Sequence, residues 1–265
     1  SKFILFFNSR NIRRKSIPDT LLAWKYFIDQ LSEEEAKSCY FILHTDAVSD
    51  AGTDLPAVKD YLFGKDYNNI MLSTNKVTAE QLNNFYNLAD AQILLSSAEG
   101  WGLALTEALL TGTPIIANVT GGMQDQMRFE DENGNWIKFD ADFPSNHRGT
   151  YKKHGKWAIP VFPAVSTLVG SPKTPYIFED HVDFKELADA MKQSYEMSKE
   201  EIVEAGKAAR EWVTSDESMM SARRMNENVI KYMDETINNF TPRKKFDFIK
   251  VDKLPVKKLR HKLVY

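Results

Sequence analysis

The sequence predicts a doubly wound α/β fold, in which helices cover both faces of a parallel sheet. Five short apolar runs alternate with segments of helical period along the first 117 residues, a pattern typical of strands buried on both faces. The chain has 265 residues, of which 43% are hydrophobic and 27% charged. This ordinary globular balance excludes disordered and fibrous proteins, and the length indicates one or two domains.

The predicted elements follow one another in strand–helix order. Strands are expected at residues 2–7, 40–43, 69–72, 91–95 and 114–117. Helices are expected between them from Pro18 onward, over 55–62, over 78–88 and over 102–110. Three more helices are expected near the C-terminus, over about 182–196, 199–213 and 216–238, the second of them opened by the capping pattern Ser-Lys-Glu-Glu from Ser198.

The regular alternation stops after residue 138. Residues 139–180 contain five prolines and scattered aromatic residues without a clear period. We interpret this stretch as an irregular insertion into a domain that spans residues 1–240. Residues 241–265 form a basic tail with a net charge of +7, although the whole chain carries −3. An acidic body with a basic tail is not typical of a duplex-DNA binder, so no nucleic acid partner is expected.

Cysteine content and hydropathy indicate a reduced, cytoplasmic setting. Cys39 is the single cysteine, which excludes an internal disulfide and makes a cysteine-based zinc site implausible. No apolar run approaches the ~18 residues that a bilayer crossing needs. For the basic tail three alternatives stay open: it folds back on the acidic body, it extends into solvent, or it makes peripheral contact with anionic lipid.

Residues 96–117 are the most informative segment for function. An apolar strand ends at Leu95, a Ser/Gly loop follows, and a helix begins near Gly102. Ligands of open α/β sheets bind at the carboxyl ends of strands, and the free N–H groups of a helix start attract an anion. Glu107, in the second helical turn, can reach back toward that start, where a carboxylate suits the paired hydroxyls of a ribose. Two glutamates eight positions apart, like Glu99 and Glu107, often occur by chance. The surrounding strands and glycines nevertheless favour a binding site here.

A cluster of cations follows the first strand. Residues 8–16 hold Arg10, Arg13, Arg14 and Lys15. Such a run can be a solvated turn, or it can clamp a phosphate, with Arg10 binding in bidentate fashion and Lys15 acting as a mobile point charge. These residues alone favour neither reading. A clamp of this kind stabilises a departing diphosphate without a metal, and no Asp-rich metal motif competes for that role.

Together these segments resemble glycosyltransferase family 4, whose enzymes have the GT-B fold of two Rossmann-like domains. The hallmark is a Glu, seven residues and a second Glu, here Glu99 and Glu107, embedded in Ser-x-x-Glu-Gly-aromatic-Gly-Leu. The upstream pair of Arg10 and Lys15 also matches the family. The resemblance covers roughly residues 2–138.

Two further segments follow in the family's order. Gly-Thr-Pro-Ile-Ile-Ala comes first, and Gly121-Gly122 comes after it. Two positions depart from the usual pattern, because Trp101 replaces the commoner Phe and Asp125 stands where the family usually has Glu after the two glycines.

The resemblance implies a role for each matching position. Arg10 and Lys15 would hold the diphosphate of a nucleotide-sugar donor, together with backbone N–H groups at the helix start. Glu107 would bind ribose hydroxyls, and Glu99 would face the donor sugar. The catalytic positions would thus be Arg10, Lys15 and Glu99, and the donor-binding positions Ser73, Gly100, Trp101, Gly102, Leu103, Glu107, Gly121 and Gly122.

The activity implied by the resemblance is the transfer of a hexose-type sugar with retention at the anomeric carbon. The cations and the helix start would take up charge on the leaving diphosphate, so neither a cofactor nor a metal is expected. Enzymes of this type use an N-terminal domain for acceptor contacts, whereas this chain opens directly on a strand. We therefore expect the C-terminal, donor-binding half of such an enzyme, inactive by itself.

Two other functions stay open from the sequence. One is a sugar-nucleotide binding module that never catalyses, and the other is a nucleotide-sugar epimerase of the same GT-B fold. A Rossmann dehydrogenase is not expected, because no Gly-x-Gly-x-x-Gly follows the first strand.

Overall fold

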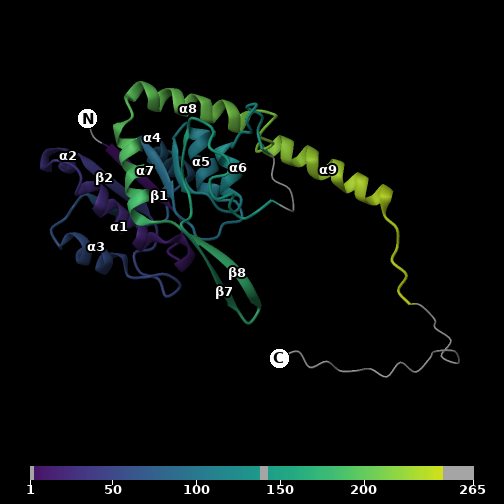
Figure 1. The fold of residues 1–265 in the computed structure, drawn as a ribbon, viewed down its shortest axis with the longest axis horizontal. Coiled ribbons are helices and arrows are strands. Elements are labelled where there is room, and N and C mark those ends of the chain that lie inside the picture. The colour runs from purple at the N-terminus through teal and green to yellow at the C-terminus, as the bar shows by residue number, and fades with distance from the viewer. Residues whose placement is uncertain (1–2, 138–142, 247–265) are drawn as a thin grey trace. The chain divides into compact units, whose positions relative to one another are not determined.

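The computed structural model describes residues 3–137 and 143–246 and is built around a six-stranded parallel sheet (Figure 1). The strand order is β3-β2-β1-β4-β5-β6, and every pairing in the sheet is parallel. The strands are β1 (Phe3–Asn8), β2 (Cys39–His44), β3 (Ile70–Ser73), β4 (Ala91–Leu94), β5 (Ile115–Asn118) and β6 (Ala158–Val161). The predicted Rossmann-like, doubly wound α/β fold is confirmed.

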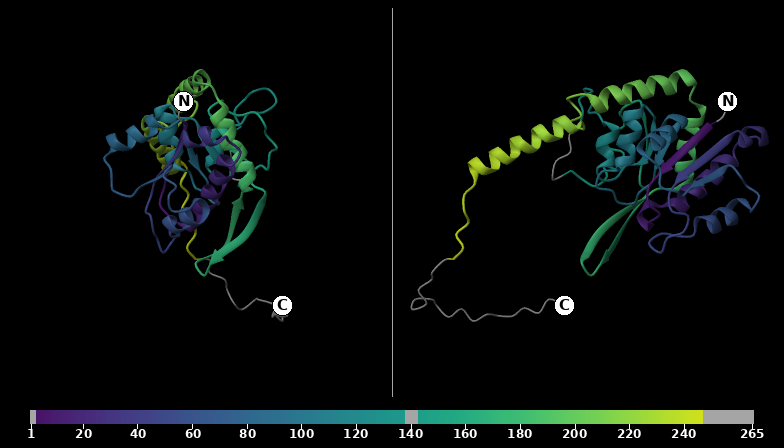
Figure 2. Two further views of the ribbon diagram at one scale, coloured as in Figure 1. Left: turned by 90° about the vertical axis from the view of Figure 1, so that its left-hand side faces the viewer. Right: turned by 180° about the vertical axis from the view of Figure 1, so that it is seen from behind.

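Helices cover both faces of this sheet (Figures 1 and 2). On one face α1 packs against α3 and α7, and on the other α5 packs against α4 and α8. Among the described residues up to Ser221, the α-helices are α1 (Ile17–Ile28), α2 (Glu33–Lys37), α3 (Leu55–Phe63), α4 (Ala79–Leu88), α5 (Leu103–Thr111), α6 (Met123–Met127), α7 (Phe184–Glu196) and α8 (Lys199–Thr214). Because both faces are covered, the central strands are buried almost throughout: Phe6, Ile93 and Ile116 are fully inaccessible to solvent.

The strand order reverses between β1 and β4. From β1 the sheet continues to β2 and β3, and from β4 it continues in the opposite direction to β5 and β6. Loops that follow β1 and β4 therefore diverge, and a crevice forms at their carboxyl ends, which is where sheets of this type bind ligands. The cations of residues 8–16 follow β1, and the Ser/Gly loop of residues 95–102 follows β4.

The expectation of an irregular insertion over residues 139–180 is corrected from residue 158 onward, where three strands form, whereas residues 143–157 contain no named helix or strand. β6 extends the parallel sheet, and β7 (Val165–Ser171) and β8 (Thr174–His181) form an antiparallel hairpin. Pro160 is compatible with β6 because this is an edge strand, where the missing N–H interrupts no ladder. Most hairpin side chains are exposed or half-buried, so no alternating apolar pattern marks these strands in the sequence.

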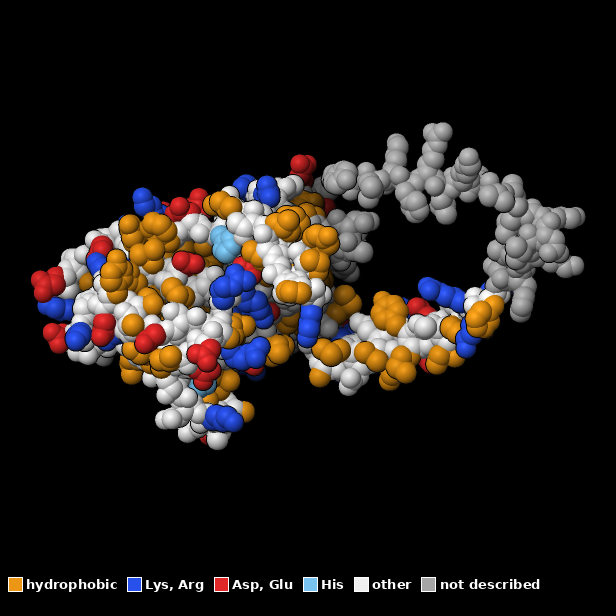
Figure 3. Space-filling view, turned by 90° about the horizontal axis from the view of Figure 1, so that it is seen from below, with side chains coloured by type: hydrophobic (Ala, Val, Ile, Leu, Met, Phe, Trp, Pro, Cys, Tyr) orange, Lys and Arg blue, Asp and Glu red, His pale blue; other side chains and the backbone are white. Residues whose placement is uncertain are grey.

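The chain divides into two compact units between Ser221 and Ala222. The predicted 1–240 domain is thus longer than the first unit by helix α9 (Ala222–Asn239). Hydrophobic side chains are exposed along α9 (Figure 3), namely Met225, Val229, Ile230, Tyr232, Met233 and Ile237.

No helix among the described residues has both the length and the apolar character needed to cross a bilayer. Most of the basic tail lies outside the described residues, so its predicted lipid contact is not addressed by them.

Candidate functional site

A cavity of about 610 Å³ opens at the carboxyl ends of the strands, at the reversal point of the sheet. Residues that follow β1, β2, β3 and β4 line it, together with the first turns of α5. It brings together eight of the predicted site residues, Arg10, Lys15, Ser73, Glu99, Trp101, Gly102, Leu103 and Glu107. Of the other three, Gly100 and Gly121 line a neighbouring cavity, and Gly122 packs behind the loop that carries Gly100.

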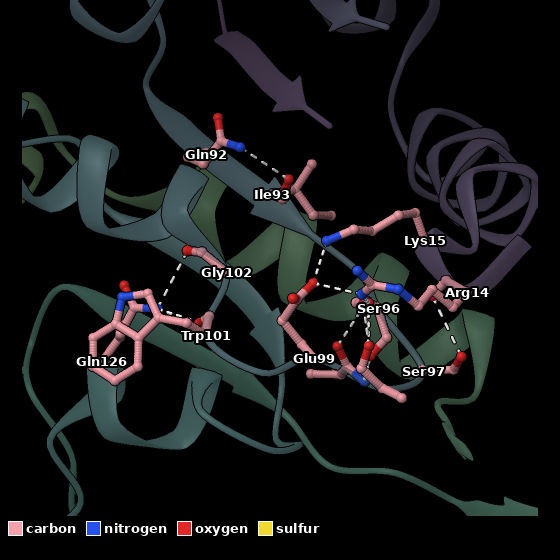
Figure 4. Close-up of polar contacts among 12 residues, drawn as sticks. Arg14, Lys15, Gln92, Ile93, Ser96, Ser97, Glu99, Trp101, Gly102 and Gln126 are labelled. Atoms are coloured by element: carbon pink, nitrogen blue, oxygen red, sulfur yellow. Dashed lines mark hydrogen bonds and ion pairs between the residues drawn. The ribbon is translucent and has the colours of Figure 1, made fainter. Parts of the chain in front are cut away.

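Two cations of the turn after β1 converge on Glu99 (Figure 4). Lys15 forms an ion pair with Oε2 of Glu99, and Nη1 of Arg14 donates a hydrogen bond to the same oxygen at 2.8 Å. Arg14 also donates to the carbonyl oxygen of Ala98 at 2.7 Å. The Lys15 and Glu99 side chains are only 8% and 10% exposed, so the loop after β1 and the loop after β4 are joined by a largely buried ion-pair cluster.

Burial and charge act in opposite directions in this cluster. Burial lowers the pKa of Lys15 below its usual value, and the nearby Arg14 and Arg10 charges lower it further, against the opposing effect of Glu99. Burial alone would raise the pKa of Glu99, but its hydrogen bonds and ion pairs with Lys15 and Arg14 outweigh this and hold the pKa below its usual value. One carboxylate thus faces two cations, and the excess positive charge favours an anionic ligand.

The two remaining cations of the turn differ in position. Arg13 donates two hydrogen bonds to Glu179, at 2.8 and 2.7 Å, so its guanidinium group points toward the hairpin. Arg13 is not one of the residues that line this cavity. Arg10 is exposed and lines the cavity. Arg13, Arg14 and Lys15 form a short 3₁₀ helix, from which Arg13 reaches Glu179 while Arg14 and Lys15 reach Glu99. Arg14 binds Glu99 and lines the cavity, although it is not among the site residues predicted from the sequence.

Helix α5 points its N-terminus into the cavity. Gly102 caps the helix with φ +85°, a backbone conformation that favours glycine. Gly102, Leu103 and Ala104 all line the cavity, and the N–H groups of a first helical turn have no acceptor within their own helix. Leu103, the first residue of the helix, is 70% exposed. This arrangement is suited to binding phosphate oxygens.

Trp101 lines the cavity with its indole N–H already engaged. Nε1 of Trp101 donates to Oγ1 of Thr106 at 2.8 Å, and that hydroxyl donates to Oε1 of Gln126 at 2.8 Å. Nε2 of Gln126 returns a hydrogen bond to the carbonyl oxygen of Trp101 at 2.6 Å (Figure 4). These hydrogen bonds hold the loop against α5 and α6, and they engage the indole N–H within the chain.

Glu107 is oriented by two partners that sequence reasoning missed. The Tyr86 hydroxyl donates to Oε2 of Glu107 at 2.6 Å, and Nδ2 of Asn8 donates to the same oxygen at 3.4 Å. Asn8 also donates to the Tyr86 hydroxyl at 2.9 Å, and burial raises the pKa of Tyr86, which keeps it a proton donor. Both partners bind Oε2, so neither of them uses Oε1, which retains its capacity to accept hydrogen bonds.

Gly121 and Gly122 bring two loops into direct backbone contact. The N–H of Gly122 donates to the carbonyl oxygen of Glu99 at 3.2 Å. A Cβ on Gly121 would lie 2.0 Å from that same oxygen, so the contact requires glycine. Neighbouring Asp125 lies outside both cavities, and burial raises its pKa to about 6.

The far end of the cavity is formed by the loops after β2 and β3. Oγ of Ser73 lies 3.0 Å from Nδ1 of His44, and Lys76 lines the same region. His44 also stacks on Phe85, with 5.8 Å between ring centroids. In the described part of the chain, no group of three or more His, Cys, Asp or Glu side chains is arranged so that it could hold a metal ion.

A segment of the chain matches a known family model. Residues 66–143 match the family model described as glycosyl transferases group 1. This segment contains Ser73, the Glu99–Glu107 segment and both glycines of the following loop. No curated protein matches the chain in sequence.

Solved structures of glycosyltransferases share the fold at low sequence identity. Sucrose-phosphate synthase from Thermosynechococcus elongatus is 17% identical with a TM-score of 0.60 over 90% of this chain, and a glycosyltransferase from Rickettsia africae is 14% identical with a TM-score of 0.61 over 91%. The E. coli trehalose-6-phosphate structure bound with UDP-2-fluoro glucose is 10% identical, with a TM-score of 0.57 over 91%. The aligned part is 46%, 49% and 45% of these structures, so the chain spans about half of their length. The fold is therefore the Rossmann-like α/β fold of GT-B glycosyltransferases.

Proposed function

We propose that this chain is the donor-binding part of a retaining glycosyltransferase of family 4, which transfers a hexose-type sugar from a nucleoside diphosphate. The observation that carries the proposal is the convergence of Lys15 and Arg14 on Glu99 beside the start of α5, in the cavity that Glu107 also lines. A diphosphate is suited to the cationic groups and the hydroxyls of a ribose are suited to the carboxylate, and both kinds of group line this cavity.

Each part of the donor has a counterpart in the cavity. The diphosphate would contact Lys15, Arg10 and the N–H groups at Gly102 and Leu103, and the ribose hydroxyls would donate to Glu107. Glu99 would hold Lys15 and Arg14 in place and face the sugar. The base would lie toward Ser73. In the E. coli structure, a UDP-sugar analogue is bound to a protein with the same fold, which supports a nucleotide sugar as the ligand class.

The proposed chemistry is the stabilisation of a leaving group. As the bond between sugar C1 and the diphosphate weakens, negative charge grows on the leaving oxygen. Fixed cations and helix N–H groups oppose that charge without having to reorganise, which makes such groups effective. We propose that neither a metal nor a cofactor takes part, and that a further domain supplies the acceptor contacts, since the chain spans about half of the similar structures.

A calorimetric titration of the chain with UDP, GDP and ADP, and then with their sugars, tests the donor site. We expect at least one nucleoside diphosphate to bind and both Glu107→Ala and Lys15→Met to weaken it tenfold or more, since hydrogen bonds to charged groups contribute about 1.5–3 kcal/mol. Glu204→Ala and Lys37→Met are matched controls, because both side chains are exposed on helices α8 and α2.

Two results would count against the proposal. If no nucleoside diphosphate binds, the chain is not a donor site. If one binds but Glu107→Ala and Lys15→Met bind it as tightly as their controls do, the ligand lies elsewhere. A transfer assay with the donor sugar and simple sugars should show no turnover by this chain, and turnover at an enzymatic rate would refute the need for a further domain.

A further inference from the structure

Gln126 is a fully buried polar side chain next to the loop that begins α5. It belongs to α6, its exposed fraction is zero, and it is not among the residues that line the two cavities of the site. Buried amides are hydrogen-bonded in folded proteins, because an unpaired one loses its bonds to water without replacement. The partners of Gln126 therefore show what this side chain holds in place.

The direction of each hydrogen bond around Gln126 follows from the chemistry of its partners. The Trp101 indole N–H can only donate, so the Thr106 hydroxyl accepts from it at 2.8 Å. The proton of that hydroxyl is then donated to Oε1 of Gln126, at 2.8 Å. This leaves Nε2 of Gln126 to donate to the carbonyl oxygens of Trp101 and Gly102, at 2.6 and 3.3 Å (Figure 4). The orientation of the amide is thus determined by the indole.

A side chain that holds a carbonyl oxygen also orients the N–H group of the same peptide unit, because the C=O and N–H bonds of a trans peptide point in opposite directions. The Trp101 carbonyl shares its peptide unit with the Gly102 N–H, and the Gly102 carbonyl shares its unit with the Leu103 N–H. Since Gln126 binds both carbonyl oxygens, both N–H groups point away from it. Gly102 and Leu103 line the cavity, whereas Gln126 does not.

The Trp101–Gly102 peptide unit depends on Gln126 more than the next unit does. The Gly102 carbonyl also accepts from the N–H of Leu105 in α5, at 2.9 Å, but no other described residue donates to the Trp101 carbonyl. Gly102 has φ +85° and no side chain, so sterics alone offer little resistance to rotation of this unit. A rotated unit would present a carbonyl oxygen to the cavity in place of an N–H group, and a carbonyl oxygen repels an anion.

Both N–H groups are available to a ligand. Neither the Gly102 nor the Leu103 N–H donates a hydrogen bond to another described residue. Donors that are fixed in direction before the ligand arrives bind an anion without a cost of reorganisation.

We propose that Gln126 is a positioning residue, which holds the Trp101–Gly102 peptide unit so that its N–H group, together with that of Leu103, binds the diphosphate. This inference rests on the proposed function, since it takes a nucleoside diphosphate as the ligand. Gln126 itself touches no part of that ligand and acts through the backbone, and the indole N–H of Trp101 and the hydroxyl of Thr106 keep its amide in the required orientation.

Binding to matched variants tests this role. Gln126→Met keeps the length of the side chain but removes its hydrogen bonds. The control is Gln124→Met, because Gln124 is also buried on α6 but donates to another loop, at the Ser145 carbonyl, at 2.8 Å. Gln126→Met should weaken a nucleoside diphosphate by about tenfold and leave the affinity for the corresponding nucleoside unchanged. Gln124→Met should change neither affinity by more than about twofold, and thermal melting confirms that each variant is folded.

Two further readouts report on the peptide unit itself. In NMR spectra of ¹⁵N-labelled wild-type protein, the nucleoside diphosphate should move the Gly102 amide proton signal downfield, and in Gln126→Met this shift should be lost. In Gln126→Glu, the carboxylate can accept from Thr106 but cannot donate to the Trp101 carbonyl unless it is protonated. Its nucleoside diphosphate affinity, divided by that of the wild type at the same pH, should therefore rise by about fivefold or more from about pH 8 to about pH 5, since burial raises the pKa of a carboxyl group.

The inference is overturned if folded Gln126→Met binds the nucleoside diphosphate as tightly as Gln124→Met does, or if it weakens nucleoside and nucleoside diphosphate equally. An unchanged downfield shift of the Gly102 signal in Gln126→Met would overturn it as well. If Gln126→Met does not fold, Gln126→Glu decides, and an affinity ratio that stays constant with pH overturns the inference. Failure of the proposed function is a separate result, because the wild-type chain would then bind no nucleoside diphosphate.

Discussion

The backbone of Gly122 lies so close to that of Gly100 that a Cβ on Gly122 would stand 2.2 Å from the Gly100 carbonyl oxygen. The loop after β5 therefore supports, from behind, the loop after β4 that carries Glu99. A Cβ on Gly100, in contrast, would meet nothing within 4 Å. A side chain is therefore excluded at Gly122 but tolerated at Gly100, and alanine variants at the two positions can be compared directly.

Gly122→Ala should destabilise the protein by roughly 2–4 kcal/mol, because one of the two backbones must shift to remove the overlap. Gly100→Ala should change the free energy of unfolding by less than about 1 kcal/mol, since its Cβ would project into open space. Urea denaturation of the two variants measures the difference. Equal stabilities would show that the loops are not held in this contact.

Tyr86→Phe should weaken nucleoside diphosphate binding by about three- to tenfold, because Glu107 loses the hydroxyl that orients it, a hydrogen bond of about 1 kcal/mol. The loss should be smaller for a 2′,3′-dideoxy nucleotide, which has no ribose hydroxyls for Glu107 to accept from. Tyr61→Phe is the control, since that side chain is 88% exposed on α3. An equal loss for both nucleotides would indicate a general structural effect of Tyr86 instead.

Acid should destabilise the protein through His147. Its side chain is buried among the rings of Phe129, Tyr151 and Phe162, and this burial lowers its pKa to about 4. The unfolded chain, with a histidine pKa of about 6.5, takes up the proton first as the pH falls. The stability that neutral His147 contributes is therefore complete above about pH 6.5 and is lost as the pH falls toward 4.

The variant His147→Phe should flatten this part of the pH profile, by an amount on the order of 1–2 kcal/mol once solvent screening is allowed for. Denaturation curves at several pH values between 4 and 7 measure it. His154→Phe, on the same segment, controls for the loss of any histidine. If the His147→Phe profile parallels that of the wild type, protonation of this ring is not what limits stability in acid.

Sequence patterns were informative where the local chain decides the structure. Strand β4, the glycine-rich loop and helix α5 were all predicted within a residue or two, because a buried apolar run, glycines and helical spacing are local signals. The Glu99–Glu107 spacing likewise placed both carboxylates beside one helix start. The hairpin was missed because its side chains are mostly exposed and carry no period.

The sequence could not predict which carboxylate each cation of the turn binds. Arg13, Arg14 and Lys15 are consecutive, and nothing local distinguishes them. Glu179 attracts the first and Glu99 the other two, and these partners are 166 and about 85 positions away along the chain. Only the packing of β8 and of the loop after β4 against one turn decides which charge faces the cavity.

By itself, therefore, the amino-acid sequence determined the α/β class, the strands that end at the site and the residue types that a nucleotide sugar would need. The tertiary structure alone decided which cation meets Glu99, how Tyr86 orients Glu107, and which loop Gln126 binds. The physical reason is range: backbone preference and hydrophobic period act over a few residues, whereas ion pairs and close backbone contacts depend on segments brought together only when the sheet is assembled.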